Sequence, residues 1–239
     1  MIGPGRARRG LAGVHCGIDV GSLRTPSYVA WLRQGEFRLD MYLAGERAPL
    51  PPPPPGWRTA DCVALDAPQG LAIPGERQRH CDRAAGTPTN RLPTSRAGMA
   101  EARLYAGLVE AGVNIFWWVH ERHLGHVAGF SEVRSGPPTV CETYPRFVLR
   151  RLGVDRARIP SKRQAPLDYV DMAWGLLRDL GYRCPSVDRP TVDHVDAMLC
   201  AVAAAAWWNA SDPLRCAVGS PPIADVVGRV IYEGYIVAP

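Results

Sequence analysis

Three short β-rich runs of this chain each end in an acidic residue. Asp19 closes the run at residues 14–18, and Asp66 and Glu142 each follow a later run. The first run alternates, is mostly apolar and ends near Gly21, which predicts a central, buried strand. A buried carboxylate is unfavourable unless a cation or hydrogen-bond donors meet it. Each acid therefore either caps a turn, the commoner role of a lone Asp, or binds something at the end of its strand.

Two further acids belong to the longest predicted helix, at residues 190–208. Asp193 and Asp196 are three residues apart, so their side chains share one face of the helix. The helix dipole favours an acid in the first turn, which explains Asp193 without any ligand. Asp196 lies one turn further along, on the face of Cys200 and Ala204 that should pack on the sheet. A carboxylate on a packing face indicates a positively charged partner.

Five acids from four elements can converge only if something neutralises them. Hard divalent cations such as Mg²⁺ or Mn²⁺ prefer carboxylate oxygens. Two such ions about 3.5–4 Å apart hold the attacking and leaving oxygens in phosphodiester hydrolysis. We expect Asp19 to contact both ions, Asp196 to hold one, and Asp193 to lie nearer the solvent. The candidate metal-binding and catalytic residues are Asp19, Asp66, Glu142, Asp193 and Asp196.

These acids can meet only if a sheet aligns the ends of its strands. The sequence predicts a hairpin turn at 34–35 and strands at residues 14–19, 28–33, 37–43, 62–65, 113–119, 139–141 and 230–237. It predicts helices at 99–112, 144–153, 166–181 and 190–208. Three strands followed by alternating strands and helices are typical of an α/β fold with a mixed sheet. Without internal repeats or a sharp change in composition, residues 1–239 are expected to form a single domain.

A long segment at residues 70–98 is expected to be an insertion in this fold. It is rich in Gly, Pro, Arg and Thr and has no periodicity, and such a loop is usually either functional or disordered. We interpret Arg77, Arg79 and Arg83 as phosphate contacts, because the planar guanidinium suits bidentate binding of phosphate oxygens. A solvated loop without a ligand is the alternative. The proline run at 49–55 is expected to be a stiff connector.

The composition narrows the class of protein further. Of 239 residues, 46% are hydrophobic and 21% charged, as in soluble globular proteins. No apolar run approaches the roughly 20 residues that span a bilayer, and the stretch after the N-terminal arginines is too short for a signal peptide. We therefore expect a cytoplasmic protein without a membrane partner, its seven scattered cysteines reduced. The net charge of +5 permits nucleic-acid binding without requiring it.

Five motifs in order resemble the predicted RNase-H-like nucleases, a largely uncharacterised family within the ribonuclease H-like superfamily. They are GIDVGS at 17–22, ALDAP at 64–68, CETYPR at 141–146, DHVDAMLCAVAA at 193–204 and EGYIVAP at 233–239. RQRHCDR at 77–83 is similar to that family's arginine–cysteine–aspartate element. Asp66 and the Asp193/Asp196 pair also resemble the pattern of Holliday-junction resolvases and related nucleases.

The resemblance implies an RNase-H-like α/β fold, with a mixed five-stranded sheet flanked by helices and its first three strands antiparallel. It also implies a nuclease that depends on Mg²⁺ or Mn²⁺ and binds nucleic acid. Arg146 of the CETYPR motif joins Arg77, Arg79 and Arg83 as a candidate substrate-binding residue. RNA or DNA as substrate, endo- or exonucleolytic action, and the oligomeric state stay open.

Two other interpretations remain open at the level of the sequence. GIDVGS also looks like the first phosphate loop of actin-like ATPases and sugar kinases, but those proteins need two such domains and a second glycine-rich loop. A non-catalytic nucleic-acid-binding protein of the same fold is the third interpretation. Five acids argue against it, because a pure binder gains nothing from a negative pocket that faces phosphates. We therefore favour the metal-dependent nuclease.

Overall fold

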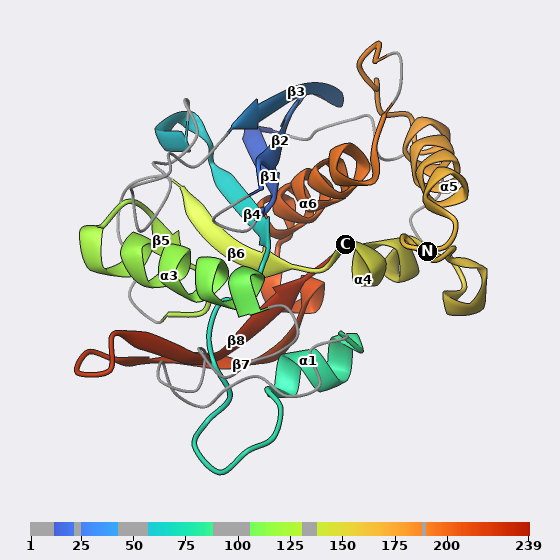
Figure 1. Cartoon of the computed structure of the whole chain (residues 1–239). Helices are drawn as coiled ribbons and strands as arrows, with labels where there is room; N and C mark the ends of the chain where they lie inside the picture. The colour runs from blue at the N-terminus through green and yellow to red at the C-terminus, as the bar shows by residue number, and fades with distance from the viewer. Residues whose placement is uncertain (1–11, 22–24, 43–56, 88–105, 131–137, 188–189) are drawn as a thin grey trace.

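The computed structural model of the chain (Figure 1) describes residues 12–21, 25–42, 57–87, 106–130, 138–187 and 190–239. Its strands are β1 (Val14–Asp19), β2 (Ser27–Arg33), β3 (Glu36–Tyr42), β4 (Cys62–Asp66), β5 (His126–Val127), β6 (Thr139–Thr143), β7 (Ala217–Asp225) and β8 (Val230–Val237). Its α-helices are α1 (His80–Ala85), α3 (Ala106–Arg122), α4 (Pro145–Arg151), α5 (Pro166–Asp179) and α6 (Val192–Asn209). Short 3₁₀ turns are η1 (Trp57–Thr59), η2 (Arg156–Arg158) and η3 (Pro213–Cys216).

The strands form one mixed sheet, which confirms the predicted α/β class. Their order is β3-β2-β1-β4-β6-β8-β7, and β5 pairs with β6 beside this path. β1, β2 and β3 are antiparallel neighbours, whereas β4, β6 and β8 continue the sheet in parallel pairs. The described sheet has eight strands, more than the expected five. Ala217–Asp225 was not predicted to be a strand, because Gly219 and a Pro-Pro pair interrupt its pattern.

Helices cover both faces of this sheet (Figure 1). α6 packs on β1, β2 and β4, and α4 and α5 pack on α6, while buried residues of α3 belong to the hydrophobic cluster of the other face. A Cβ at Gly17 would overlap the backbone of Ala197 and Ala201, so β1 needs a glycine where α6 crosses it. The Thr191 hydroxyl and the His194 side chain form a capping box that fixes where α6 begins.

Residues 113–119 are helical, which corrects the strand predicted there. They continue α3 through Gly112, which was expected to end the helix. A Cβ at Gly112 would come within 2.7 Å of the Pro68 carbonyl and 2.8 Å of Ala67, so this glycine allows a close approach of helix and loop. A short apolar run has no periodicity that separates a buried helix from a buried strand, and β-branched and aromatic residues favoured the wrong choice.

The segment at 70–98 is partly ordered, in contrast to the expected irregular loop. Leu71 pairs with Tyr232 of β8 in an isolated bridge, and α1 follows, ending at Gly86 with φ 62°. Residues 88–98 of this segment and the proline run at 49–55 lie outside the described residues. No helix in the described ranges is long and apolar enough to cross a membrane.

Candidate metal centre

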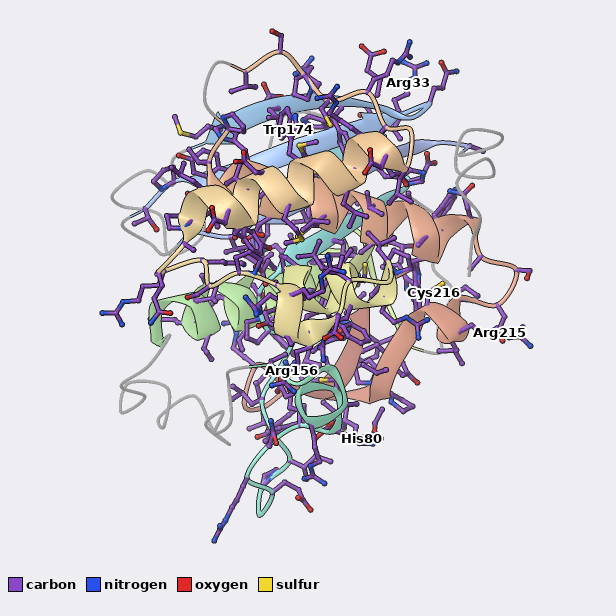
Figure 2. The ribbon with its side chains drawn as sticks, turned by 90° about the vertical axis from the view of Figure 1, so that its right-hand side faces the viewer. Arg33, His80, Arg156, Trp174, Arg215 and Cys216 are labelled. Atoms are coloured by element: carbon purple, nitrogen blue, oxygen red, sulfur yellow. The ribbon has the colours of Figure 1, made fainter. Side chains whose placement is uncertain are left out.

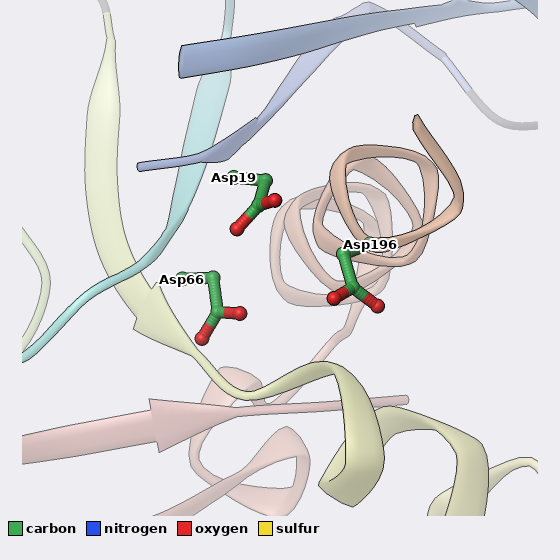
Figure 3. Close-up of side chains that lie close together, drawn as sticks. All are labelled: Asp19, Asp66 and Asp196. Atoms are coloured by element: carbon green, nitrogen blue, oxygen red, sulfur yellow. The ribbon is translucent and has the colours of Figure 1, made fainter. Parts of the chain in front are cut away.

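Three of the predicted acids come together at the ends of the central strands (Figure 3). Asp19 closes β1, Asp66 closes β4, and Asp196 lies on α6. Each contributes a carboxylate oxygen to a group in which these atoms all lie within 4.8 Å of one another. The group lines a cleft of about 530 Å³, in which Asp19 and Asp66 are half-buried and Asp196 is buried. Oxygen ligands at this spacing suit a hard divalent cation.

The register of the sheet explains why the two strand acids meet. β1 and β4 are parallel, and Asp19 and Asp66 are direct partners. Side chains alternate across a strand, so Asp19 points to the side of Gly17, and Asp66 to the side of Ala64. Gly17 touches α6, and Ala64 belongs to the same hydrophobic cluster as α6. Both carboxylates therefore face the helix that carries Asp196.

Asp196 already has a positively charged partner within the protein. The Lys162 ammonium forms an ion pair with one of its carboxylate oxygens, and the Tyr169 hydroxyl donates to the other at 2.6 Å. Lys162 is the chain's single lysine and lies between η2 and α5. The prediction that Asp196 needs a cation is thus met, and the cation comes from a residue that was not among the candidates.

One ammonium leaves the cluster electrically unbalanced. With all groups ionised, the three carboxylates and Lys162 carry a net charge of −2. Burial, reinforced by Asp196 and Asp66, raises the pKa of Asp19 well above its ordinary value. Burial raises the pKa of Asp66 to about 7 even though Lys162 opposes this. Burial also raises the pKa of Asp196 against the influence of Lys162. A divalent cation would balance this charge and let the acids ionise.

Glu142 does not join this group. It lies within β6 and pairs in register with Leu65, whose side chain packs on the face opposite Asp66. Its two carboxylate oxygens accept hydrogen bonds from Arg79 at 2.7 Å each, and the backbone N–H of Gln69 donates to one of them at 2.6 Å. Glu142 thus lines the same cleft as the partner of a buried guanidinium, outside the close group of acids, and its role as a metal ligand stays a prediction.

Arg79 is fully buried, which corrects its assignment as a phosphate contact. Besides Glu142, it binds both carboxylate oxygens of Asp82, at 2.7 and 3.0 Å, and the Thr87 hydroxyl donates to Asp82 at 2.8 Å. Burial opposes the charge of Arg79, but its carboxylate partners, Glu142 foremost, hold its pKa above the ordinary value. The RQRHCDR motif thus contains a buried arginine whose ion pairs with Asp82 and Glu142 join α1 to β6; we call these ion pairs the ionic lock.

The remaining candidates lie outside the close group of acids. Asp193 lines the cleft and is half-buried, outside the close group. Arg146 lines the same cleft and donates to the carbonyls of Ile159 and Pro160 at 3.2 and 2.8 Å. Arg77 is exposed and is not among the residues that line this cleft.

Lys162 and Tyr169 are the site residues that the sequence analysis missed. One signal for Lys162 was present, because a single lysine among twenty-eight basic residues departs from the arginine bias of the chain. Tyr169 opens an amphipathic helix and carries no signal that separates it from core tyrosines. Both reach Asp196 only through folding, since they lie 34 and 27 residues before it in the chain.

Comparison with known protein families gives one family match. The family described as "Protein of unknown function (DUF429)" matches residues 17–222, and the chain belongs to this family. The match extends from β1 through α6 into β7, so it includes the three clustered acids and Lys162. No curated protein and no solved structure matches the chain.

Proposed function

We propose that this chain is a metal-dependent nuclease of RNase-H-like fold that hydrolyses phosphodiester bonds. The observation that carries the proposal is the convergence of Asp19, Asp66 and Asp196 in an open cleft. Their excess negative charge would repel a phosphate on its own, so a cleft for phosphodiesters needs a cation there. A chain with a net charge of +5 supplies the surrounding attraction for a polyanion.

The strand order supports the RNase-H-like part of the proposal. The first three strands of the path β3-β2-β1-β4-β6 are antiparallel, as the resemblance implies, and in this structure the next two run parallel to β1. β8 and β7 extend this sheet at the β6 edge. Asp19 and Asp66 lie where β1 and β4 end, and ligands in open α/β sheets bind beyond such strand ends.

The donor set fits Mg²⁺ or Mn²⁺. Asp19, Asp66 and Asp196 would hold the ion, with Asp193 on the solvent side of the cleft. When bound, such an ion polarises a phosphodiester and lowers the pKa of a bound water. The Tyr169 hydroxyl orients the Asp196 carboxylate. Each carboxylate oxygen has more than one acceptor position, so Asp196 can keep that bond while it binds an ion.

A non-catalytic nucleic-acid-binding protein is the second candidate, and the Lys162–Asp196 ion pair favours it. In this case the ammonium would take the place of a metal ion permanently, and the acids would stay partly protonated. The two candidates differ in one measurable property, which is whether a divalent cation binds in competition with Lys162. Nucleotide turnover without nucleic acid would instead favour the ATPase-like alternative.

The decisive experiment incubates purified protein with labelled single- and double-stranded RNA and DNA in Mg²⁺, Mn²⁺ or EDTA. Wild type is compared with Asp19→Asn and with Asp168→Asn, an exposed acid of α5 that serves as a matched control. We expect cleavage that needs the metal and falls by orders of magnitude only in Asp19→Asn. Absence of cleavage, together with no thermal stabilisation by either metal, would select the second candidate.

A further inference from the structure

A second pocket, of about 410 Å³, adjoins the carboxylate cleft and is lined by arginines. Asp82, Thr87, Tyr144 and Arg146 line both cavities, so the two lie side by side. We call it the arginine pocket, and its basic residues are Arg83, Arg146, Arg150 and Arg156. They come from α1, α4 and η2, and Figure 2 shows Arg156 between α4 and α1.

Two of these guanidinium groups lie close to one point in space. A Cβ built on Gly86 would be 3.5 Å from Nη1 of Arg150 and 4.0 Å from Nη1 of Arg156. The absence of a side chain at Gly86 therefore leaves room between the end of α1 and these two arginines. Gly86 has φ 62°, which favours glycine, so the turn at the end of α1 depends on this residue.

Within the described ranges, no ion pair involves Arg83, Arg146, Arg150 or Arg156. Asp82 lines the pocket too, but both of its oxygens bind Arg79. Burial lowers the pKa of Arg150, and the charge of Arg156 lowers it further. An uncompensated cluster of like charges is unfavourable in the free protein and favourable when an anion binds.

Backbone contacts hold part of the pocket in place before any ligand arrives. Arg150 donates to the carbonyls of Ala85 and Arg146, and Arg146 donates to those of Ile159 and Pro160. These bonds tie α1 and the loop before α5 to α4. Arg83 and Arg156 are exposed, and their guanidinium groups are available to a ligand. Planar guanidinium groups bind phosphate oxygens in pairs, and pre-ordered ones lose little entropy on binding.

We propose that the arginine pocket binds a phosphate group of the nucleic-acid strand whose neighbouring phosphodiester lies at Asp19, Asp66 and Asp196. The inference rests on the proposed function for the identity of the strand. Phosphate binding itself depends only on the pocket, and a strand that enters both cavities is fixed in direction. The phosphate is either internal to the strand or a terminal monoester, and the two sources share the same chemistry.

The test measures binding by fluorescence anisotropy in EDTA, where cleavage does not occur. The probes are a short labelled single-stranded DNA with a 5′-hydroxyl and the same strand with a 5′-phosphate. Arg156→Gln and Arg83→Gln remove pocket charges, and Arg158→Gln removes an exposed charge of η2 that is not a lining residue. We expect a loss of about tenfold in affinity for each pocket variant, with a salt slope reduced by about one. Arg158→Gln should bind as the wild type does.

Two results would overturn the proposal. One is an equal loss of affinity in Arg156→Gln and Arg158→Gln, which would indicate general charge attraction. The other is unchanged binding in both pocket variants. A larger loss with the 5′-phosphate strand assigns the pocket to a terminal phosphate, and equal losses assign it to an internal one. If the protein shows no cleavage in Mg²⁺ or Mn²⁺ but its binding still depends on Arg156, the proposed nuclease activity is rejected and the proposal of phosphate binding in the arginine pocket is kept.

Discussion

At the scale of single residues, the three clustered acids have unequal surroundings. Asp196 is buried and bonded to Lys162 and Tyr169, whereas Asp19 meets mainly like charges. The same substitution to Asn should therefore have opposite effects on stability at the two positions. Measuring the stability of both variants, with and without a metal ion, distinguishes a metal site from a set of structural carboxylates.

The first prediction is that Asp19→Asn keeps or slightly raises the melting temperature in EDTA, because it removes repulsion among the acids. The variant should also lose the stabilisation that Mg²⁺ gives to wild type, since a ligand stabilises in proportion to its binding. Thermal melts with EDTA and with Mg²⁺ measure both effects, and Asp168→Asn is the control. The same Mg²⁺ response in all three proteins would contradict the metal site.

The second prediction concerns the other side of the ion pair. Asp196→Asn leaves the Lys162 ammonium without its partner, so we expect it to lower the free energy of unfolding in EDTA by about 1–3 kcal/mol. Lys162→Met removes the competing cation, and we expect it to increase Mg²⁺ affinity severalfold at pH 8. Chemical denaturation and calorimetric titration with Mg²⁺ check these outcomes. Weaker Mg²⁺ binding by Lys162→Met would show that Lys162 supports the ion instead of competing with it.

At the scale of elements, the site depends on how closely α6 crosses β1. Gly17 is the contact point, and the direction of the crossing brings Asp196 over the end of the strand that carries Asp19. The ion pairs of Arg79 with Asp82 and Glu142 hold α1 against β6. This position of α1 places Arg83 at the arginine pocket.

The third prediction compares one chemical change in two places. Gly17→Ala adds a methyl group that would overlap backbone atoms of α6. We therefore expect a loss of several kcal/mol in unfolding free energy, or failure to fold. Gly175→Ala, in the middle of α5, meets nothing within 4 Å and should stabilise the protein by about 0.5–1 kcal/mol. Denaturant melts compare the two variants. Equal stability would contradict the close packing of α6 on β1.

At the scale of the whole molecule, the acid cluster should give the metal-free protein an unusual dependence on pH. The folded state raises the pKa values of Asp19, Asp66 and Asp196, so between about pH 4 and 7 it binds more protons than the unfolded state. The free energy of unfolding therefore falls as the pH rises through this window. Burial lowers the pKa of His15 and of His194, and these groups oppose the trend between their lowered values and the ordinary value of 6.5.

The fourth prediction is that wild type in EDTA is less stable at pH 8 than at pH 6, and that Mg²⁺ removes the difference. The metal binds ionised carboxylates, so its contribution grows with pH and offsets the loss. Asp66→Asn, which removes the group with a pKa of about 7, should flatten the profile in EDTA. Unfolding curves across this pH range measure the effect, and a rise in stability from pH 6 to pH 8 without metal would contradict it.

The sequence by itself determined the elements that repeat a clear pattern. The alternating run ending in Asp19, the hairpin at 34–35, the helix that begins after Thr191, and the α/β order of the chain all follow from local periodicity and capping. The convergence of Asp19, Asp66 and Asp196 was also predictable, because parallel strand ends share an edge and Asp196 is an acid on a packing face.

The tertiary structure alone decided which acids share a face and which cations meet them. Glu142 lies outside the close group because the register places it beside Leu65, and register depends on pairing between distant strands. Arg79 is a buried partner of Glu142, which lies 63 residues further along the chain. Lys162 is the partner of Asp196, which lies 34 residues further along. Such contacts form only when packing supplies the burial that makes an ion pair favourable, and no local pattern in a sequence records that burial.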